Sequence, residues 1–256
     1  MLAKQPAPVF VLNSLDGNVS VIDPVTWTEK KRIPTGKEPH HLYLTPDEKS
    51  LIVANAMSDS LTFIDPRTAQ VQRTVTGILD PYHLRFSPDM KWFVTAANRL
   101  NHVDIYRWDG QNAHLSKRIA TGKTPSHLWI DSRSQTVWAT MQDSNEIVSI
   151  DLNTQTLTTR TPVGAVPADV YGTPDDKYLM VGLTAPVGPG LIKASYTRTE
   201  VEVPGISVDG NQVAVGYEYG LSKRTALEFT YGRDSKAKTA TGKNVGGADF
   251  TLHHNF

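Results

Sequence analysis

The sequence predicts an all-β protein assembled from a repeated four-stranded unit. A proline opens a short apolar segment four times, at intervals of 42, 44 and 42 residues, at Pro39, Pro81, Pro125 and Pro167. The aspartate expected to close one strand of each unit keeps the same intervals, at Asp23, Asp65, Asp109 and Asp151. A period near 40 residues with only short β segments is typical of propeller blades, so we expect a partial β-propeller of about four blades.

Within one unit the residues predict four antiparallel strands. The first, at 40–44, is apolar and is followed by Thr45-Pro46-Asp47, where proline and aspartate favour a turn. The second, at 51–54, is a continuous apolar run, as expected for a strand covered on both faces by neighbouring blades. A third strand at 61–64 stops at Asp65-Pro66, and 70–75 alternates like an outer edge strand.

The repeated region holds 17 predicted strands, one more than four complete blades. Three strands are expected within 9–33, three full blades at 39–75, 81–119 and 125–161, and two last strands at 168–171 and 178–181. Over residues 9–182 these motifs, punctuated by Val21-Ile22-Asp23-Pro24, resemble the YVTN-type β-propeller repeat family. Because that family is usually seven-bladed, the resemblance implies a partial array.

A different alternation begins near residue 184. Four segments are apolar on one face and polar on the other, a pattern of outer-membrane barrel strands, at 192–196, 213–219, 227–231 and 250–256. Gly190-Leu191-Ile192-Lys193, Leu221-Ser222-Lys223-Arg224-Thr225 and Phe256 resemble the C-terminal end of Gram-negative general porins, over residues 186–256. We therefore expect a propeller repeat region at 1–183 and a four-stranded antiparallel porin-like β-meander at 184–256.

The change of pattern falls inside a repeat, which indicates a fusion of the two sequence types. The porin resemblance implies that the outer-membrane assembly machinery reads the last strand, at Phe250, Leu252, His254 and Phe256. It also implies the periplasm or outer membrane of a Gram-negative cell envelope, although the apolar run at 9–12 is too short for an export signal. Unpaired sheet edges at the junction predict self-association.

Four histidines fall in predicted first strands, which line the central channel of a propeller. They are His40, His41, His83 and His127. They could be cofactor ligands, because the resemblance to haem-binding propellers of periplasmic nitrite reductases implies channel-facing histidines near haem. Alternatively, the repeat favours a histidine that is hydrogen-bonded to the next blade. In the fourth copy of the repeat, Asp169 stands at the position of the histidine, so the histidines do not form a complete ring of ligands. We therefore expect no metal site and no cofactor, with haem as the alternative.

Composition excludes several classes of function. Lys plus Arg and Asp plus Glu both number 26, so no basic surface for nucleic acid is expected. The chain has no cysteine, which excludes disulfides, thiolate metal sites and cysteine nucleophiles. The porin-like part contains charged residues that either line a pore or are ordinary solvated charges. They are Lys193, Arg198, Glu218, Glu228 and Arg233.

Three functions are compatible with these patterns. The favoured one is a non-catalytic binding or scaffold protein of the cell envelope, because the repeats supply most of the chain and no catalytic motif. The second is an outer-membrane pore, which needs strands from other chains because about eight strands are the minimum for a closed barrel. The third is an enzyme acting on haem or on a lactone, as related propellers include lactonases.

Overall fold

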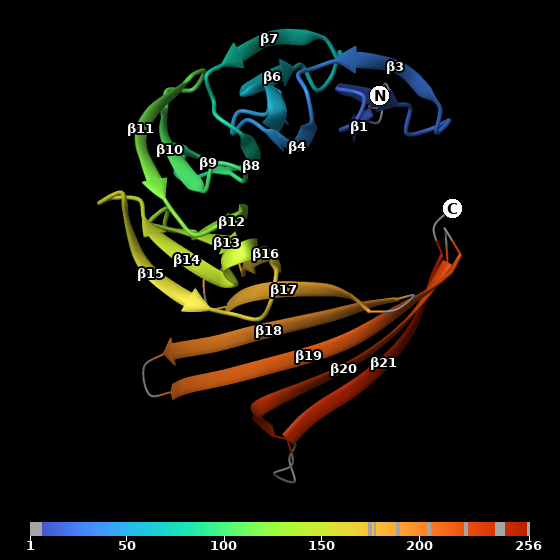
Figure 1. Cartoon of the computed structure of the whole chain (residues 1–256), viewed down its shortest axis with the longest axis vertical. Coiled ribbons are helices and arrows are strands. Elements are labelled where there is room, and N and C mark those ends of the chain that lie inside the picture. The colour runs from blue at the N-terminus through green and yellow to red at the C-terminus, as the bar shows by residue number, and fades with distance from the viewer. Residues whose placement is uncertain are drawn as a thin grey trace, which may run out of the picture.

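The computed structural model describes residues 7–173, 176, 178–187, 190–203, 206–222, 225–238 and 244–254, and these residues form five antiparallel sheets arranged in an open arc (Figure 1). The first sheet contains β1 (Val9–Asn13), β2 (Asn18–Ile22) and β3 (Glu29–Pro34). The second contains β4 (Pro39–Leu44), β5 (Leu51–Asn55), β6 (Ser60–Ile64) and β7 (Val71–Thr76). A short 3₁₀ helix, η1 (Ala56–Ser58), connects β5 to β6.

The third sheet contains β8 (Pro81–Phe86), β9 (Trp92–Ala97), β10 (His102–Trp108) and β11 (Ala113–Ala120). The fourth contains β12 (Pro125–Ile130), β13 (Thr136–Met141), β14 (Glu146–Asp151) and β15 (Thr156–Pro162), with η2 (Gln142–Ser144) between β13 and β14. The fifth contains β16 (Pro167–Gly172), β17 (Tyr178–Val187), β18 (Gly190–Val203), β19 (Ile206–Ser222), β20 (Thr225–Lys238) and β21 (Asn244–His254). The predicted all-β, blade-repeat fold is confirmed, and β1–β17 are its 17 expected strands.

The sequence period has a structural counterpart in the turns. The residue before each first strand has a positive φ, at Glu38 (53°), Asp80 (43°), Thr124 (58°) and Val166 (52°). In the last three, the backbone N–H bonds a side chain of the preceding blade: Asp59 Oδ1 at 2.8 Å, Asn101 Oδ1 at 2.9 Å and Asn145 Oδ1 at 2.9 Å. The repeat therefore conserves a turn and a link between blades as well as the strands themselves.

Val166 is the unfavourable member of this series. Val166 is β-branched and adopts a left-handed backbone conformation, which costs an L-residue about 1–2 kcal/mol. Asparagine tolerates this conformation better. The side chain is 48% exposed, so little burial is lost on replacement. We expect Val166→Asn to raise the free energy of unfolding by about 1 kcal/mol. Urea denaturation would show this as a higher midpoint with an unchanged slope, and a lower midpoint would contradict it.

The apolar core lies between consecutive blades. Phe93 is fully buried and packs with Ile52 and Leu61 of the blade before it, while Leu128 and Val148 pack against Val94 and its neighbours in the blade before theirs. This arrangement explains the continuous apolar second strands such as β5, in which every residue is buried. Blade-to-blade packing also sets the curvature of the arc, and so the distance between first strands.

The first strands β4, β8, β12 and β16 lie on the inner side of the arc (Figure 1). β8 contacts both β4 and β12, and β12 contacts β16. Near the second residue of each strand the register with the partner strand shifts, for example between Pro39 and His41 and between Pro81 and His83. These irregularities place the residue that follows at an equivalent position in every blade.

The fifth sheet continues without a break across the predicted domain boundary. Residue 183 lies inside β17, which pairs with β18 from Tyr178↔Thr199 to Val187↔Gly190. β18 therefore occupies the place of a third blade strand. The predicted porin-like segments, the last of them as far as residue 254, are parts of β18–β21. These strands have 14, 17, 14 and 11 residues, against five to eight in β1–β16. No helix within the described ranges has the length and apolar character to cross a bilayer.

Each of the five sheets has two edge strands that pair on one side only in the described part of the chain. Among them, β1 pairs with β2 alone and β21 pairs with β20 alone. At the predicted junction, by contrast, β17 and β18 are each paired on both sides, so the open edges expected there are absent from the described strands. Exposed edges present free N–H and C=O groups to a second strand. Self-association through such edges therefore remains a prediction.

Candidate metal centre

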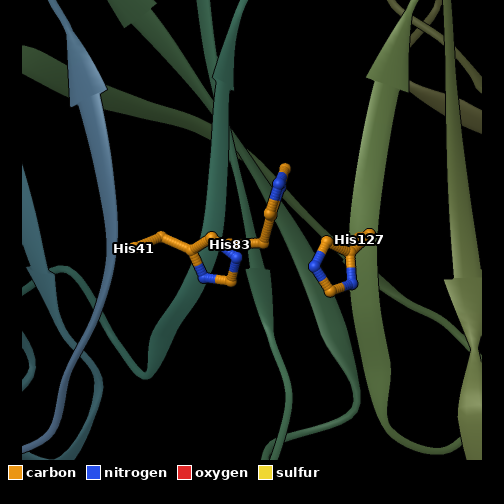
Figure 2. Close-up of side chains that lie close together, drawn as sticks. All are labelled: His41, His83 and His127. Carbon is orange, nitrogen blue, oxygen red and sulfur yellow. The ribbon is translucent and has the colours of Figure 1, made fainter. Parts of the chain in front are cut away.

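Three histidines from consecutive blades converge on the inner side of the arc (Figure 2). His41 lies on β4, His83 on β8 and His127 on β12, each at the third position of its strand. The ring centroids are 4.5 Å apart for His41 and His83, 4.8 Å for His83 and His127, and 5.2 Å for His41 and His127. One nitrogen from each ring can be chosen so that all three lie within 4.8 Å of one another.

A hydrogen bond fixes the tautomer of His41. Its Nδ1 lies 2.5 Å from the carbonyl oxygen of Tyr82 on the next first strand. A carbonyl only accepts, so Nδ1 carries the proton and Nε2 keeps the lone pair that a metal needs. An imidazole whose second nitrogen donates to a backbone carbonyl is the usual arrangement of a metal-binding histidine.

His83 contains one of the buried polar atoms that have no hydrogen-bond partner among the described residues. The residue is 6% exposed, and its Nδ1 is buried without a hydrogen-bond partner among the described residues. Leaving a buried polar atom unpaired costs about 1–3 kcal/mol. A metal ion held at the His83 ring would remove this imbalance.

His127 is oriented by its own strand and by the next blade. Its Nδ1 lies 2.9 Å from Ser126 Oγ, and the backbone of Ala168 in the next blade raises the pKa of the ring. Ala168 precedes Asp169 as Tyr82 precedes His83, so the rings of His41 and His127 interact with equivalent backbone positions of the next blade. The alternative interpretation, in which a repeat histidine is hydrogen-bonded to the neighbouring blade, describes His41, whereas His83 departs from it.

All of these histidines are neutral near pH 7. Burial lowers the pKa of His41 to about 4, and burial also holds the pKa of His83 well below its usual value. Burial likewise lowers the pKa values of His40 and His127, although the charge of Asp169 partly offsets this at His127. Neutral imidazole is the form that binds metal, so protons compete weakly for this centre.

His40 lies beside the three-histidine cluster without being part of it. Its Nδ1 is 3.0 Å from Nδ1 of His41, and its ring lies against that of Tyr82 with centroids 3.9 Å apart. Its position next to the register shift explains why adjacent histidines of one strand take different roles. Three of the four predicted histidines therefore form the candidate site.

A second layer of side chains lies two residues further along the same strands. Arg85 follows His83, and its guanidinium carbon is 5.4 Å from the ring centroid of Tyr43, 5.7 Å from that of Trp129 and 5.7 Å from that of Tyr171. Arg85 Nη1 donates to Tyr43 Oη at 3.3 Å, and Nε donates to the Leu128 carbonyl at 3.2 Å. Sequence reasoning missed this layer, although the third and fifth positions of each first strand carry the signal.

The predicted pore-lining charges lie in the fifth sheet. Lys193 Nζ is 2.7 Å from Glu218 Oε2 and 2.8 Å from Glu228 Oε2, and the two carboxylates raise the pKa of this lysine. By strand alternation Arg233 shares the opposite face with Tyr231. The side chain of Arg198 is outside the described residues.

The predicted assembly signal lies at the end of this sheet. Phe250 on β21 is 68% exposed. Leu252 and His254 also belong to β21, but their side chains lie outside the described residues, as does all of Phe256.

Among the described residues the cluster offers three imidazoles and no fourth ligand, which is the ligand set of an open metal site. Zinc bound by three protein groups keeps a position for water or another ligand, whereas structural zinc sites use four. Two nitrogens bound to one zinc at about 2.0–2.1 Å lie roughly 3.3 Å apart in tetrahedral geometry. Since the donor nitrogens lie within 4.8 Å, small ring rotations bring them to this separation.

Comparison with known families identifies the repeat. The sequence profile of the YNCE-like beta-propellers matches residues 3–194, which is three quarters of the chain. The chain belongs to the YNCE-like beta-propeller family. The match ends within β18 and so extends past the boundary predicted at residue 183. Curated protein sequences gave no match.

Several solved structures share the fold. Hydrazine synthase from Kuenenia stuttgartiensis is 18% identical with a TM-score of 0.58, over 81% of this chain and 65% of that one, so this chain spans less than two thirds of its length. A protein from Bacteroides fragilis provisionally assigned as a 6-phosphogluconolactonase is 15% identical, with a TM-score of 0.62 over 81% and 67% of the two chains.

The dihydro-heme d1 dehydrogenase NirN, in complex with DHE, is 12% identical with a TM-score of 0.55 over 99% and 75% of the chains. At these identities the comparisons establish the fold alone.

Proposed function

We propose that this YNCE-like propeller is a non-catalytic binding protein of the cell envelope that holds one transition-metal ion at His41, His83 and His127. The observation that carries the proposal is the convergence of three imidazoles from consecutive blades, one of which has a buried nitrogen with no partner among the residues that the structure describes. An inner-side site of this kind uses the curvature of the repeat to bring together residues that are 42 and 44 positions apart.

The ligand set favours zinc and its neighbours over the hard cations. Imidazole suits Zn²⁺, Cu²⁺, Ni²⁺ and Fe²⁺, while Ca²⁺ and Mg²⁺ require oxygen ligands. The second nitrogen of His41 already bonds a carbonyl oxygen, which raises the basicity of the coordinating one. Zn²⁺ is therefore the test ion, and Co²⁺ its spectroscopic substitute.

We expect metal-free protein to bind one Zn²⁺ per chain in isothermal titration calorimetry, and to bind neither Ca²⁺ nor Mg²⁺ at the same concentration. His114→Ala is the matched control, because His114 is an exposed histidine whose Nε2 lies 2.8 Å from Asp109 Oδ2, away from the cluster. This variant should keep the full stoichiometry. Absence of zinc binding in the wild type, or its loss in His114→Ala, would reject the proposal.

Haem is the competing ligand. NirN, whose fold is similar, is known in complex with DHE, and a histidine of the cluster could serve as an axial ligand. Addition of haemin to the metal-free protein provides the comparison. A Soret band that is lost in both His83→Ala and His127→Ala, together with absent zinc binding, would replace the metal proposal with the haem one.

A pore function is the second candidate, favoured by the two-faced fifth sheet. On one face Val213, Val215, Phe229 and Tyr231 are 48–51% exposed, and on the other Lys193 joins Glu218 and Glu228. This alternation is what an outer-membrane segment requires, and it supports an interaction of β21 with the assembly machinery. Conductance steps in a planar bilayer would support the pore, and their absence from detergent-refolded protein would count against it.

A further inference from the structure

We infer that the metal at His41, His83 and His127 takes a small carboxylate as its fourth ligand, and that Arg85 binds the free end of that carboxylate. This inference rests on the proposed metal site. It extends the function from holding an ion to metal-dependent capture of an organic acid on the inner side of the arc.

Arg85 lies on the same strand as His83, two residues further along. Residues 83 and 85 lie on the same face of β8, because side chains alternate along a strand. In the same way Tyr43 follows His41, and Trp129 follows His127. The inner side thus has one layer of three imidazoles and, next to it, one layer in which two aromatic rings flank a guanidinium.

The guanidinium of Arg85 is held by two hydrogen bonds and three aromatic rings. Nε donates to the Leu128 carbonyl and Nη1 to Tyr43 Oη, while the rings of Tyr43, Trp129 and Tyr171 all lie within 5.7 Å of its central carbon. Within the described part of the chain Nη2 makes no hydrogen bond. The group is therefore fixed in place and still has donors for an acceptor molecule.

The charges around the proposed site are unbalanced. Neutral imidazoles bring no negative charge to a divalent ion, and Arg85 adds another positive charge nearby, which the Asp169 carboxylate beside His127 offsets only in part. Two acidic residues lie close by. Glu38 pairs with Arg99 at 2.7 Å, and Asp169 Oδ1 accepts the N–H of Val170 at 2.8 Å. An anion entering between metal and guanidinium would relieve this repulsion and fill the open coordination position.

A carboxylate is the anion that fits a site between a metal ion and an arginine. A carboxylate can give one oxygen to the metal and accept from arginine with the other, a geometry to which the planar guanidinium is suited. The aromatic walls offer apolar surface for the carbon part of the molecule. A phosphate dianion has more acceptor oxygens than the remaining N–H donors of Arg85 can satisfy, because Nε and Nη1 already donate to protein groups. We therefore propose a monocarboxylate as the ligand and use acetate as the probe.

The test uses cobalt-loaded protein, whose visible absorption bands report a change of ligand at the metal. We expect acetate to shift these bands saturably, and Arg85→Met to weaken acetate binding by at least about tenfold, as expected for loss of a charged hydrogen bond. Cobalt affinity should change by less than about threefold. Arg107→Met is the matched control, because Arg107 also lies over an aromatic ring, that of Trp92 at 5.2 Å.

Each result distinguishes this inference from the proposed function. If cobalt does not bind at the histidines, the proposed function itself fails. If cobalt binds but acetate leaves its spectrum unchanged, or Arg85→Met binds acetate as well as the wild type, only the carboxylate inference is overturned. A shift by phosphate and not acetate would overturn it as well.

Two further variants complete the design. Arg85→Lys keeps the charge without the planar fork, so it should bind acetate with intermediate affinity even if Arg85→Met does not fold. Asp169→Asn tests whether that carboxylate is the fourth ligand. If Asp169→Asn changes the cobalt spectrum in the absence of acetate, the protein supplies its own carboxylate and the inference is wrong.

Discussion

Replacing His83 with alanine is expected to lower the affinity for Zn²⁺ by at least about 100-fold. Loss of a group that only supports a metal ligand commonly costs 10- to 100-fold, and a direct ligand should cost more. His83 is also the central member of the cluster, with its ring 4.5 Å from that of His41 and 4.8 Å from that of His127. Competition calorimetry against a chelator of known affinity would measure the loss.

Controls separate coordination from folding. His83→Gln retains most of the side-chain volume and should also lose zinc, since an amide is a poor ligand for it. His114→Ala should bind zinc as the wild type does. If His83→Ala folds by circular dichroism and binds zinc with unchanged affinity, the ion does not use His83.

Replacing Arg118 with methionine is expected to lower the free energy of unfolding by roughly 3–5 kcal/mol. Arg118 holds Asp104 through Nε–Oδ1 at 2.8 Å and Nη2–Oδ2 at 2.7 Å, and Asp104 has no exposed side-chain surface. Without the arginine, a buried carboxylate keeps only Tyr106 Oη at 3.1 Å and His102 Nε2 at 3.5 Å as polar partners among the described residues. Urea denaturation would measure the change.

The double variant Asp104→Leu/Arg118→Met is the control for this prediction. Removing both charges leaves no unpaired buried group, so most of the lost stability should return. A single variant that loses less than about 1 kcal/mol, or a double variant no more stable than the single one, would show that the pair is not what stabilises the third blade.

The strand repeat could be predicted because its signals are local. Prolines and aspartates set turns through their own backbone preferences, and the same intervals of 42, 44 and 42 residues reappear in the positive-φ residues Glu38, Asp80, Thr124 and Val166. Strand lengths after residue 184 were less well predicted. There β17 joins the last blade to a sheet of longer strands. The length of these strands is set by their pairing with one another, which the sequence does not reveal.

The candidate metal centre could be predicted only in part. The sequence placed His41, His83 and His127 on the first strands, but it led us to expect no metal site, because the fourth copy carries Asp169 and the ring of ligands is incomplete. The distances between the rings depend on the curvature of the arc, which arises from packing such as that of Phe93 between blades. His40 and His41 are equivalent in the sequence until the register shift separates them.

Anomalous diffraction at the zinc absorption edge, from crystals of the zinc-loaded protein, tests the account most directly. The account predicts one strong peak per chain, about 2.0–2.1 Å from a ring nitrogen of each of His41, His83 and His127. A zinc ion located elsewhere, for example beside His114 and Asp109, with no peak among the three rings, would contradict it.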